Sequence, residues 1–260
     1  MKFTVLTLFP EMIASFASQG LLGQAARSGR VQVDTLNPRQ FTQDVHKTVD
    51  DRAFGPGDGM VMKVVPLRAA VATLSPETRL VVLSPQGRLW NQAEARAWAA
   101  EGRPVALVCG RYAGIDQRFT VLSGAEEISI GDYVLNGGEI AACAVIESVA
   151  RLLPGVLGNA LSAQADSFSA ESEPLECPQF TRPREVEGLP VPEPLLSGHH
   201  AKIAEFQTAV SRVRTALLRP DLAHFAEADL SRAARQLNDL SDLELRAIGV
   251  ARASLRRWLE

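Results

Sequence analysis

The sequence predicts an α/β domain with a parallel sheet covered by helices, followed by a small helical domain. Two patterns support this prediction. Up to about residue 158, short apolar runs alternate with longer stretches of helical periodicity, as is typical of parallel sheets covered by helices. From residue 201 onward, helical patterns fill most of the chain. The four apolar runs cover residues 3–8, 31–36, 80–83 and 105–109.

The first run is interpreted as a buried strand. It faintly resembles a signal peptide, but Pro10 and Glu11 end the apolar stretch too early. A helix is predicted over residues 92–100 with Asn91 as its cap, and another over 139–153, ended by Pro154 and Gly155. The polar segment 39–63 is predicted to be a loop. Its glycine-rich part, residues 55–60, is not followed by the Gly-Lys-Ser/Thr of a phosphate-binding loop.

Three glycine-bearing loops follow strand-like runs, at residues 84–88, 110–116 and 130–138. Ligands of open α/β sheets bind beyond the carboxyl ends of the strands. Each loop alone is explained by an ordinary turn, but all three together favour a nucleotide-like ligand.

The chain is predicted to divide at a small, polar segment, residues 159–173, which has the composition of a flexible linker. It separates a first domain, residues 1–158, from a second, residues 174–260. The second domain begins with a proline-rich stretch up to residue 194. Helices are predicted over residues 201–218, 230–240 and 243–259.

Composition excludes several classes of protein. The 260 residues are 46% hydrophobic and 22% charged, so the chain is not expected to be disordered as a whole. The net charge is −3, so the overall charge does not attract nucleic acid. Three widely spaced cysteines fit neither a disulfide framework nor a zinc ribbon. No apolar stretch is long enough for a transmembrane helix. We therefore expect a cytoplasmic protein without a membrane partner.

Motifs of common enzyme classes are absent from the sequence. It contains no Gly-x-Ser-x-Gly and no His-Glu-x-x-His, and it predicts no metal site. Arginines gather on the C-terminal helical segments, where they could neutralise phosphates but are more often a solvated face. By pattern alone, Asp166 is an ordinary linker carboxylate and Arg151 an ordinary cation near a helix end.

Nine short motifs, taken in order, resemble one family along nearly the whole chain: the bacterial tRNA (guanine-N1)-methyltransferases, TrmD, of the SPOUT superfamily. They include Leu-Phe-Pro-Glu-Met at 8–12, Thr-Val-Asp-Asp-Arg at 48–52 and Leu-Ser-Pro-Gln-Gly at 83–87. Val-Cys-Gly-Arg-Tyr at 108–112, Ile-Ser-Ile-Gly-Asp-Tyr-Val-Leu at 128–135 and Pro-Gly-Val-Leu-Gly at 154–158 follow. The last are Asp-Ser-Phe at 166–168, Phe-Thr-Arg-Pro at 180–183 and Leu-Leu-Ser-Gly-His-His-Ala at 195–201.

The resemblance implies a deep trefoil knot in the first domain, an all-helical C-terminal domain, a homodimer, and methyl transfer from S-adenosylmethionine to guanosine 37 of tRNA, beside the anticodon. Cofactor contacts are implied for Leu83, Ser84, Pro85, Gly110, Ile130, Gly131, Asp132, Tyr133, Val134, Leu135, Gly137 and Gly138. Contacts to the anticodon branch of the tRNA are implied for Asp50, Gly59, Ser167, His199 and Arg214.

The resemblance also assigns the chemistry. Asp166 is expected to act as the general base on guanine N1, and Arg151 to stabilise the charge that develops on O6. The resemblance also implies a possible role for Mg²⁺ in catalysis, although the sequence carries no recognisable magnesium motif. One departure stands out, because the family usually has Gly-Arg-Tyr-Glu-Gly where this chain has Ala113 after Tyr112. Asp50, Asp116 or Asp132 could replace that carboxylate.

Two other functions stay open at this stage. The chain could be a related SPOUT methyltransferase with another RNA target. In that case the expected role of Asp166, which is to accept hydrogen bonds and a proton from guanine, would have no purpose. The chain could also be a dimeric RNA-binding protein with weakened catalysis, as Ala113 suggests. The retained Arg151 and Asp166 argue against that second alternative.

Overall fold

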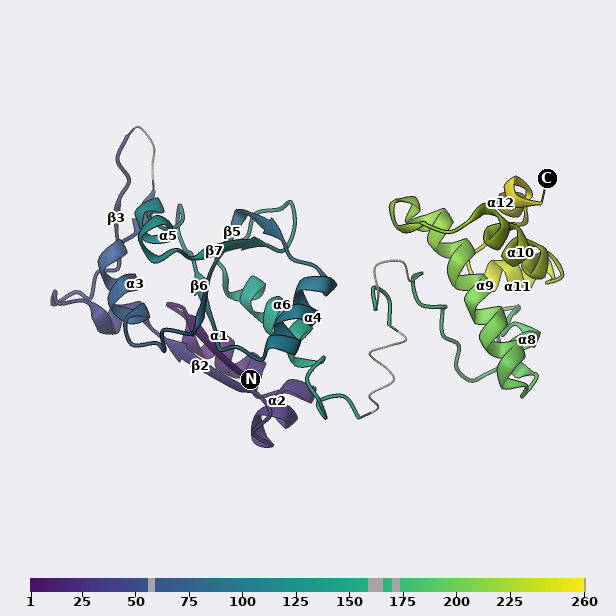
Figure 1. Ribbon diagram of the computed structural model, residues 1–260, viewed down its shortest axis with the longest axis horizontal. Coiled ribbons are helices and arrows are strands. Elements are labelled where there is room, and N and C mark those ends of the chain that lie inside the picture. Colours follow the sequence, from purple (N-terminus) through teal and green to yellow (C-terminus); the bar gives the residue numbers. More distant parts are fainter. Residues whose placement is uncertain (56–58, 159–165, 170–173, 260) are drawn as a thin grey trace. The chain divides into compact units, whose positions relative to one another are not determined.

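The computed structural model describes residues 1–55, 59–158, 166–169 and 174–259, and it divides the chain into two compact units (Figure 1). Unit 1 is Met1–Ala163 and unit 2 is Gln164–Glu260. The apolar side chains of each unit pack into cores of their own.

Unit 1 is built on a five-stranded sheet in which all neighbouring strands run parallel. The order across the sheet is β2-β1-β6-β5-β7, so the last three strands lie side by side. Their carboxyl ends meet at one edge, where the glycine-bearing loops begin. The strands are β1 (Lys2–Leu6), β2 (Gln32–Leu36), β5 (Arg79–Leu89), β6 (Val105–Cys109) and β7 (Glu126–Ser129).

Both faces of this sheet are buried, because successive side chains of a strand point to opposite faces. Val81 and Leu83 join one core, whereas Val82 between them joins the other. The first core is completed by α1 (Pro10–Ala17), α2 (Gly20–Arg27), α4 (Gln92–Glu101) and α6 (Glu139–Ala150). The second core is completed by α3 (Val64–Val71) and α5 (Gln117–Ser123). Unit 1 is therefore a three-layer sandwich.

Unit 2 is mainly helical. A cluster of buried apolar side chains, including Phe206, Val210, Leu237 and Trp258, joins its helices. A two-stranded antiparallel hairpin of β8 (Glu185–Val186) and β9 (Leu189–Pro190) precedes them. The helices are α8 (Glu193–Leu196), α9 (His200–Leu218), α10 (Glu227–Asn238), α11 (Asp242–Ala247) and α12 (Arg252–Leu255), with short 3₁₀ turns η2 (Pro220–Leu222) and η3 (Arg256–Trp258).

Caps explain where several helices begin and end. The Asn91 side chain accepts a hydrogen bond from the backbone N–H of Glu94 at 3.0 Å, so the predicted cap of α4 is confirmed. That helix ends at Gly102, whose φ of +62° is the left-handed conformation usual at a helix end. Helix α6 ends at Ala150, earlier than predicted. Its last turn tightens into bonds three residues apart before Pro154, which cannot continue a helix.

Three further expectations are corrected. Segment 39–63 is not simply a loop, because it contains the 3₁₀ turn η1 (Pro38–Phe41, at its start) and a hairpin of β3 (Asp50–Arg52) and β4 (Met60–Met62). Segment 84–88 belongs to β5: Leu83 and Arg88 both pair with Ile128, so the residues between them form a bulge. The C-terminal domain is not all-helical, since it includes the β8–β9 hairpin.

The helix predicted over residues 243–259 is also wrong. The chain divides there into α11, α12 and η3. The break falls at Gly249, whose φ is +70°, and Val250 donates its N–H to the Leu245 carbonyl oxygen at 2.9 Å. This bond pattern closes a helix end, and it overrides the apolar periodicity that continues beyond it.

Candidate functional site

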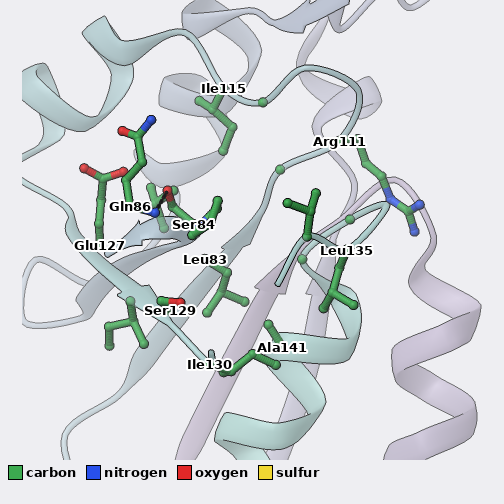
Figure 2. Close-up of a pocket in the computed structure, with 18 of the residues that line it drawn as sticks. Leu83, Ser84, Gln86, Arg111, Ile115, Glu127, Ser129, Ile130, Leu135 and Ala141 are labelled. Carbon is green, nitrogen blue, oxygen red and sulfur yellow. Dashed lines mark hydrogen bonds between the residues drawn. The ribbon is translucent and has the colours of Figure 1, made fainter. Parts of the chain in front are cut away.

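The three predicted loops enclose one pocket of about 410 Å³ at the carboxyl ends of β5, β6 and β7 (Figure 2). The first loop is the β5 bulge, and the others follow β6 and β7. A cavity of this size lies in the range of small-molecule and cofactor sites. The lining residues are Val82–Gln86, Gly110–Ile115, Gln117, Thr120, Glu127–Gly131, Tyr133–Gly138 and Ala141.

The second and third loops touch backbone to backbone. The N–H of Gly138 donates to the carbonyl oxygen of Gly110 at 3.1 Å, and Arg111 forms an antiparallel bridge with Gly137. A Cβ atom on Gly138 would lie only 2.7 Å from the Cα of Cys109. A side chain at that position would force the two loops apart, so glycine is needed for their close approach.

A buried ion pair ties these loops to the end of β1. The Glu139 side chain, 1% exposed, lies in the first turn of α6, where the helix dipole stabilises a negative charge. Its Oε2 atom lies 2.8 Å from Nη2 of Arg111, and its Oε1 accepts a hydrogen bond of 2.6 Å from the Thr7 hydroxyl. The Arg111 guanidinium also lies 4.2 Å from the centroid of the Phe9 ring. The ion pair therefore fixes three segments that are distant in sequence.

The β3–β4 hairpin joins the pocket through the second loop. Ala113 donates its N–H to the Met60 carbonyl at 2.9 Å, and Met62 donates its own to Gly114 at 2.9 Å. Asp50 lies opposite Met62 in this hairpin. Gly59 lies against the second loop, where a Cβ would meet the Ala113 Cβ at 3.5 Å. Two predicted tRNA contacts, Asp50 and Gly59, are thus carried by an element that packs on the pocket.

The structure brings the predicted cofactor residues together. Of that set, every member except Asp132 lines the pocket. Figure 2 shows Leu83, Ser84, Ile130 and Leu135 around the cavity. The first and third loops are separated by about forty residues in the chain, so this convergence is a tertiary feature.

The predicted catalytic residues belong to different units. Arg151 follows the last residue of α6 in unit 1, where its N–H donates to the Glu147 carbonyl at 3.2 Å. Asp166 belongs to unit 2, and its carbonyl accepts from the N–H of Ser169 at 3.2 Å. Most of the predicted linker, residues 159–165 and 170–173, lies outside the described residues.

The remaining predicted tRNA contacts lie in unit 2. The Ser167 hydroxyl accepts from the Glu176 N–H at 2.9 Å. His199 precedes α9, and its side chain does not cap the helix. Arg214 donates to the carbonyl oxygen of Ile248 and so joins α9 to the end of α11. A hollow of about 970 Å³ lies elsewhere in unit 2, and its lining includes Phe180, Arg182 and Arg184.

Several pocket residues were not anticipated from the sequence, among them Gln117 and Glu127. The sequence does contain a signal that could have drawn attention to Glu127. Glu126 and Glu127 are consecutive, and the alternation of a strand sends neighbouring side chains to opposite faces. One of the two must therefore differ in environment from the other, but only the packing shows which one lines a cavity.

The ionisable groups near the pocket limit its chemistry. Burial raises the pKa of the Cys109 thiol well above its ordinary value. Burial also raises the pKa of Cys143 to about 11. Both side chains are therefore thiols at neutral pH and poor nucleophiles. Hydrogen bonds from the Arg118 side chain lower the pKa of Asp116, so this carboxylate is ionised and held by its neighbour.

Neither a metal cluster nor a membrane span is found in the described part of the chain. Within residues 1–55, 59–158, 166–169 and 174–259, no three His, Cys, Asp or Glu side chains are grouped to hold a metal ion. Among the same residues, no helix combines the length and apolar character needed to cross a membrane.

Comparisons with known proteins identify close relatives. Residues 1–225 match the family model described as tRNA (Guanine-1)-methyltransferase TrmD. The chain is 48% identical over 238 residues to a tRNA (guanine-N(1)-)-methyltransferase of Bordetella parapertussis, covering 88% of this chain and 92% of the relative. It is 49% identical over 222 residues to the protein of that name from Shewanella frigidimarina, covering 84% and 88%.

Proposed function

Because the chain belongs to the tRNA (guanine-1)-methyltransferase TrmD family, we propose that it transfers a methyl group from S-adenosylmethionine to N1 of guanosine 37 in tRNA. The observation that carries this proposal is the convergence of three glycine-bearing loops on one pocket, lined by the residues that the resemblance assigns to the cofactor. S-adenosylmethionine, when bound, supplies an electrophilic methyl group.

The pocket fits this cofactor in size and in the nature of its walls. Gly110, Gly137 and Gly138 leave main chain at the surface of the cavity, where a flat adenine ring can approach closely. Ile130, Leu135 and Ala141 supply apolar contacts. In our proposal these residues bind and orient the adenosine part.

Asp166 is proposed to select guanine and to take its proton. Guanine presents N1–H and an exocyclic amine as adjacent donors, and an ionised carboxylate can accept from both. Adenine has an acceptor at the same ring position and would be repelled. Once Asp166 had taken the N1 proton, N1 would form the new bond to the methyl carbon while the bond from that carbon to the sulfonium sulfur breaks, and S-adenosylhomocysteine would leave.

Arg151 is proposed to stabilise the negative charge that develops on O6 when N1 loses its proton. A free aspartate has a pKa of about 3.9, far below that of guanine N1–H, so proton transfer needs such stabilisation. The guanidinium is a permanent cation with a rigid fork of donors, and lysine does not reproduce that geometry.

The tRNA substrate is proposed to contact both units. In unit 1, Asp50 and Gly59 lie on the hairpin that packs against the pocket. In unit 2, Ser167, His199 and Arg214 are the proposed contacts. The exposed Arg182 and Arg184 beside Phe180 add a local positive surface suited to phosphates, although the net charge of the chain is −3.

A homodimer and a trefoil knot complete the proposal, as the family resemblance implies. Exposed apolar side chains near the pocket support the dimer: Tyr133 is 54% exposed, Val134 87% and Ile140 55%. Such side chains on one region of a surface are typical of protein–protein contacts. In the dimer, Asp166 of one protomer could complete the site of its partner.

The direct test is methyl transfer from labelled S-adenosylmethionine to a tRNA transcript with guanosine at position 37, with and without Mg²⁺. We expect incorporation that disappears in an adenosine-37 transcript and falls about 10²- to 10⁴-fold in Asp166→Ala. S-adenosylhomocysteine should bind that variant normally, which separates catalysis from cofactor binding. Tight tRNA binding without incorporation would favour the RNA-binding alternative, and methylation elsewhere would favour another target.

A further inference from the structure

The two consecutive glutamates of β7 have different environments. Glu126 is held by two arginines, with Oε1 lying 3.2 Å from Nε of Arg79 and Oε2 lying 3.0 Å from Nη2 of Arg88. Glu127 lines the pocket instead. Among the residues that the structure describes, no ion pair or side-chain hydrogen bond engages the Glu127 carboxylate. It is therefore available to a ligand.

Among the described residues that line the pocket, Glu127 is the single acidic residue and Arg111 is the single basic residue. Arg111 is committed to Glu139 at 2.8 Å. The three carboxylates that the sequence offered as replacements for the family's glutamate do not face the cavity in the same way. Asp116 is held by Arg118 and caps α5, and neither Asp50 nor Asp132 lines the pocket. The negative charge that faces the cavity is thus that of Glu127.

The pocket is polar at one side and apolar at the other. Figure 2 shows Glu127, Gln86 and Ser84 gathered together, apart from Ile130, Leu135 and Ala141. The backbone confirms this proximity, because Val82 pairs with Glu127 and a Cβ on Gly87 would lie 2.4 Å from the Glu127 carbonyl carbon. A ligand with an apolar ring at one end and a cation at the other matches this distribution.

We infer that Glu127 accepts a hydrogen bond from the ammonium group of the methionine part of S-adenosylmethionine, with the adenine held at the opposite, apolar side. This inference rests on the proposed function. It gives the pocket a carboxylate in a chain that has Ala113 where the family usually has glutamate. Charge-assisted hydrogen bonds of this kind typically change affinity by about 10- to 100-fold.

The test compares two ligands by isothermal titration calorimetry on the full-length chain. S-adenosylhomocysteine carries the ammonium group, whereas 5′-methylthioadenosine keeps adenine and ribose but lacks the amino acid. We expect Glu127→Gln to weaken S-adenosylhomocysteine about 10- to 100-fold and methylthioadenosine less than about twofold. Retained methylthioadenosine binding also shows that the variant pocket is folded. The matched control is Glu126→Gln, which should leave both affinities unchanged.

A second variant tests the exchange of carboxylates. Adding Ala113→Glu to Glu127→Gln should recover part of the lost affinity, because it restores a negative charge to another wall of the same pocket. Recovery for S-adenosylhomocysteine alone is the expected result.

Two results would overturn the inference while leaving the proposed function intact. If Glu127→Gln weakened both ligands equally, the carboxylate would contact the nucleoside part instead of the ammonium. If it weakened neither, Glu127 would have no part in binding. Failure of the unmodified chain to bind either ligand would instead overturn the proposed function itself.

Discussion

The two units differ in the polar groups that they bury. Among the described residues, unit 1 buries a carboxylate, that of Glu139, whereas the polar side chains buried in unit 2 are the hydroxyls of Ser211 and Thr215. The Thr215 hydroxyl donates to the Ser211 carbonyl at 2.7 Å and accepts from the Leu175 N–H at 2.8 Å. The core of unit 2 is otherwise apolar.

The difference in buried polar groups indicates that a buried ion pair shapes the loops of unit 1, whereas apolar packing dominates the core of unit 2. Burying a charge is unfavourable unless it is paired, and replacing such a pair by apolar residues is often stabilising. The Arg111–Glu139 pair is therefore better explained by the loop geometry that it imposes than by stability. Among the described residues of unit 2, the buried side chains are mainly apolar, so apolar packing accounts for most of its core.

The largest expected effect is that of Glu139→Ala. This change leaves Arg111 partly buried without its partner, which should lower the free energy of unfolding of unit 1 by about 3–5 kcal/mol. Chemical denaturation measures the loss, and hydrogen exchange locates it to α6 and the second loop. Glu139→Gln retains an acceptor for Thr7 and should lose less. A loss for Glu139→Ala below about 1 kcal/mol, the range of exposed pairs, would contradict the comparison.

In unit 2 the corresponding change is Leu237→Ala. This side chain is fully buried, so its truncation leaves a cavity and should destabilise unit 2 by about 3 kcal/mol. Hydrogen exchange should rise in unit 2 and stay unchanged around the pocket. The control is Leu243→Ala, because Leu243 is 50% exposed and should change little. Equal effects of the two variants would show that apolar packing does not dominate this unit.

A smaller effect is expected on tRNA binding from Arg182→Ala and Arg184→Ala. Each removes a cation from the exposed hollow beside Phe180, so affinity should fall several-fold, and the salt dependence should decrease by about one ion per arginine removed. Titrations of labelled tRNA at several salt concentrations measure both quantities. Arg235→Ala, on the exposed side of α10, is the control. An equal loss in that variant would mean that the hollow has no special part.

The smallest expected effect is a pH dependence of unit 2 through Glu244. Burial raises the pKa of this carboxyl, but hydrogen bonds from the backbone of Glu193 at 2.8 Å and from Ser241 outweigh it, and the net shift is downward. The ionised form therefore stabilises the folded state above about pH 4.5, by roughly 1 kcal/mol as a capping residue. This stabilisation is lost as the pH falls through the lowered pKa.

Denaturation of Glu244→Gln between pH 3 and pH 7 tests this assignment. The amide oxygen still accepts the capping hydrogen bond from the Ser241 N–H, but the side chain does not titrate, so the variant should lose part of the pH dependence of the unmodified chain. Unchanged pH profiles would show that other carboxyl groups account for the acid sensitivity of unit 2.

Local patterns in the sequence were sufficient for much of the fold. The run at 105–109 is β6 with the same bounds, and Asn91 caps α4 as predicted, because both depend on neighbouring residues. The prediction of one helix over residues 243–259 failed at Gly249. There, a closing hydrogen bond and a left-handed backbone override apolar periodicity. The β3–β4 hairpin was missed because its strands are too short to show alternation.

The parallel sheet, the glycine-bearing loops and the family could be predicted from the sequence, since these features follow from local periodicity and from motifs read in order. The residues that share the pocket could be identified only in the folded chain. Thr7 and Glu139 are 132 positions apart, yet their side chains are hydrogen-bonded beside Arg111. It also assigned Glu126 to two arginines and Glu127 to the cavity. The physical reason is that such contacts depend on the packing of strands and loops, which spacing along the chain does not encode.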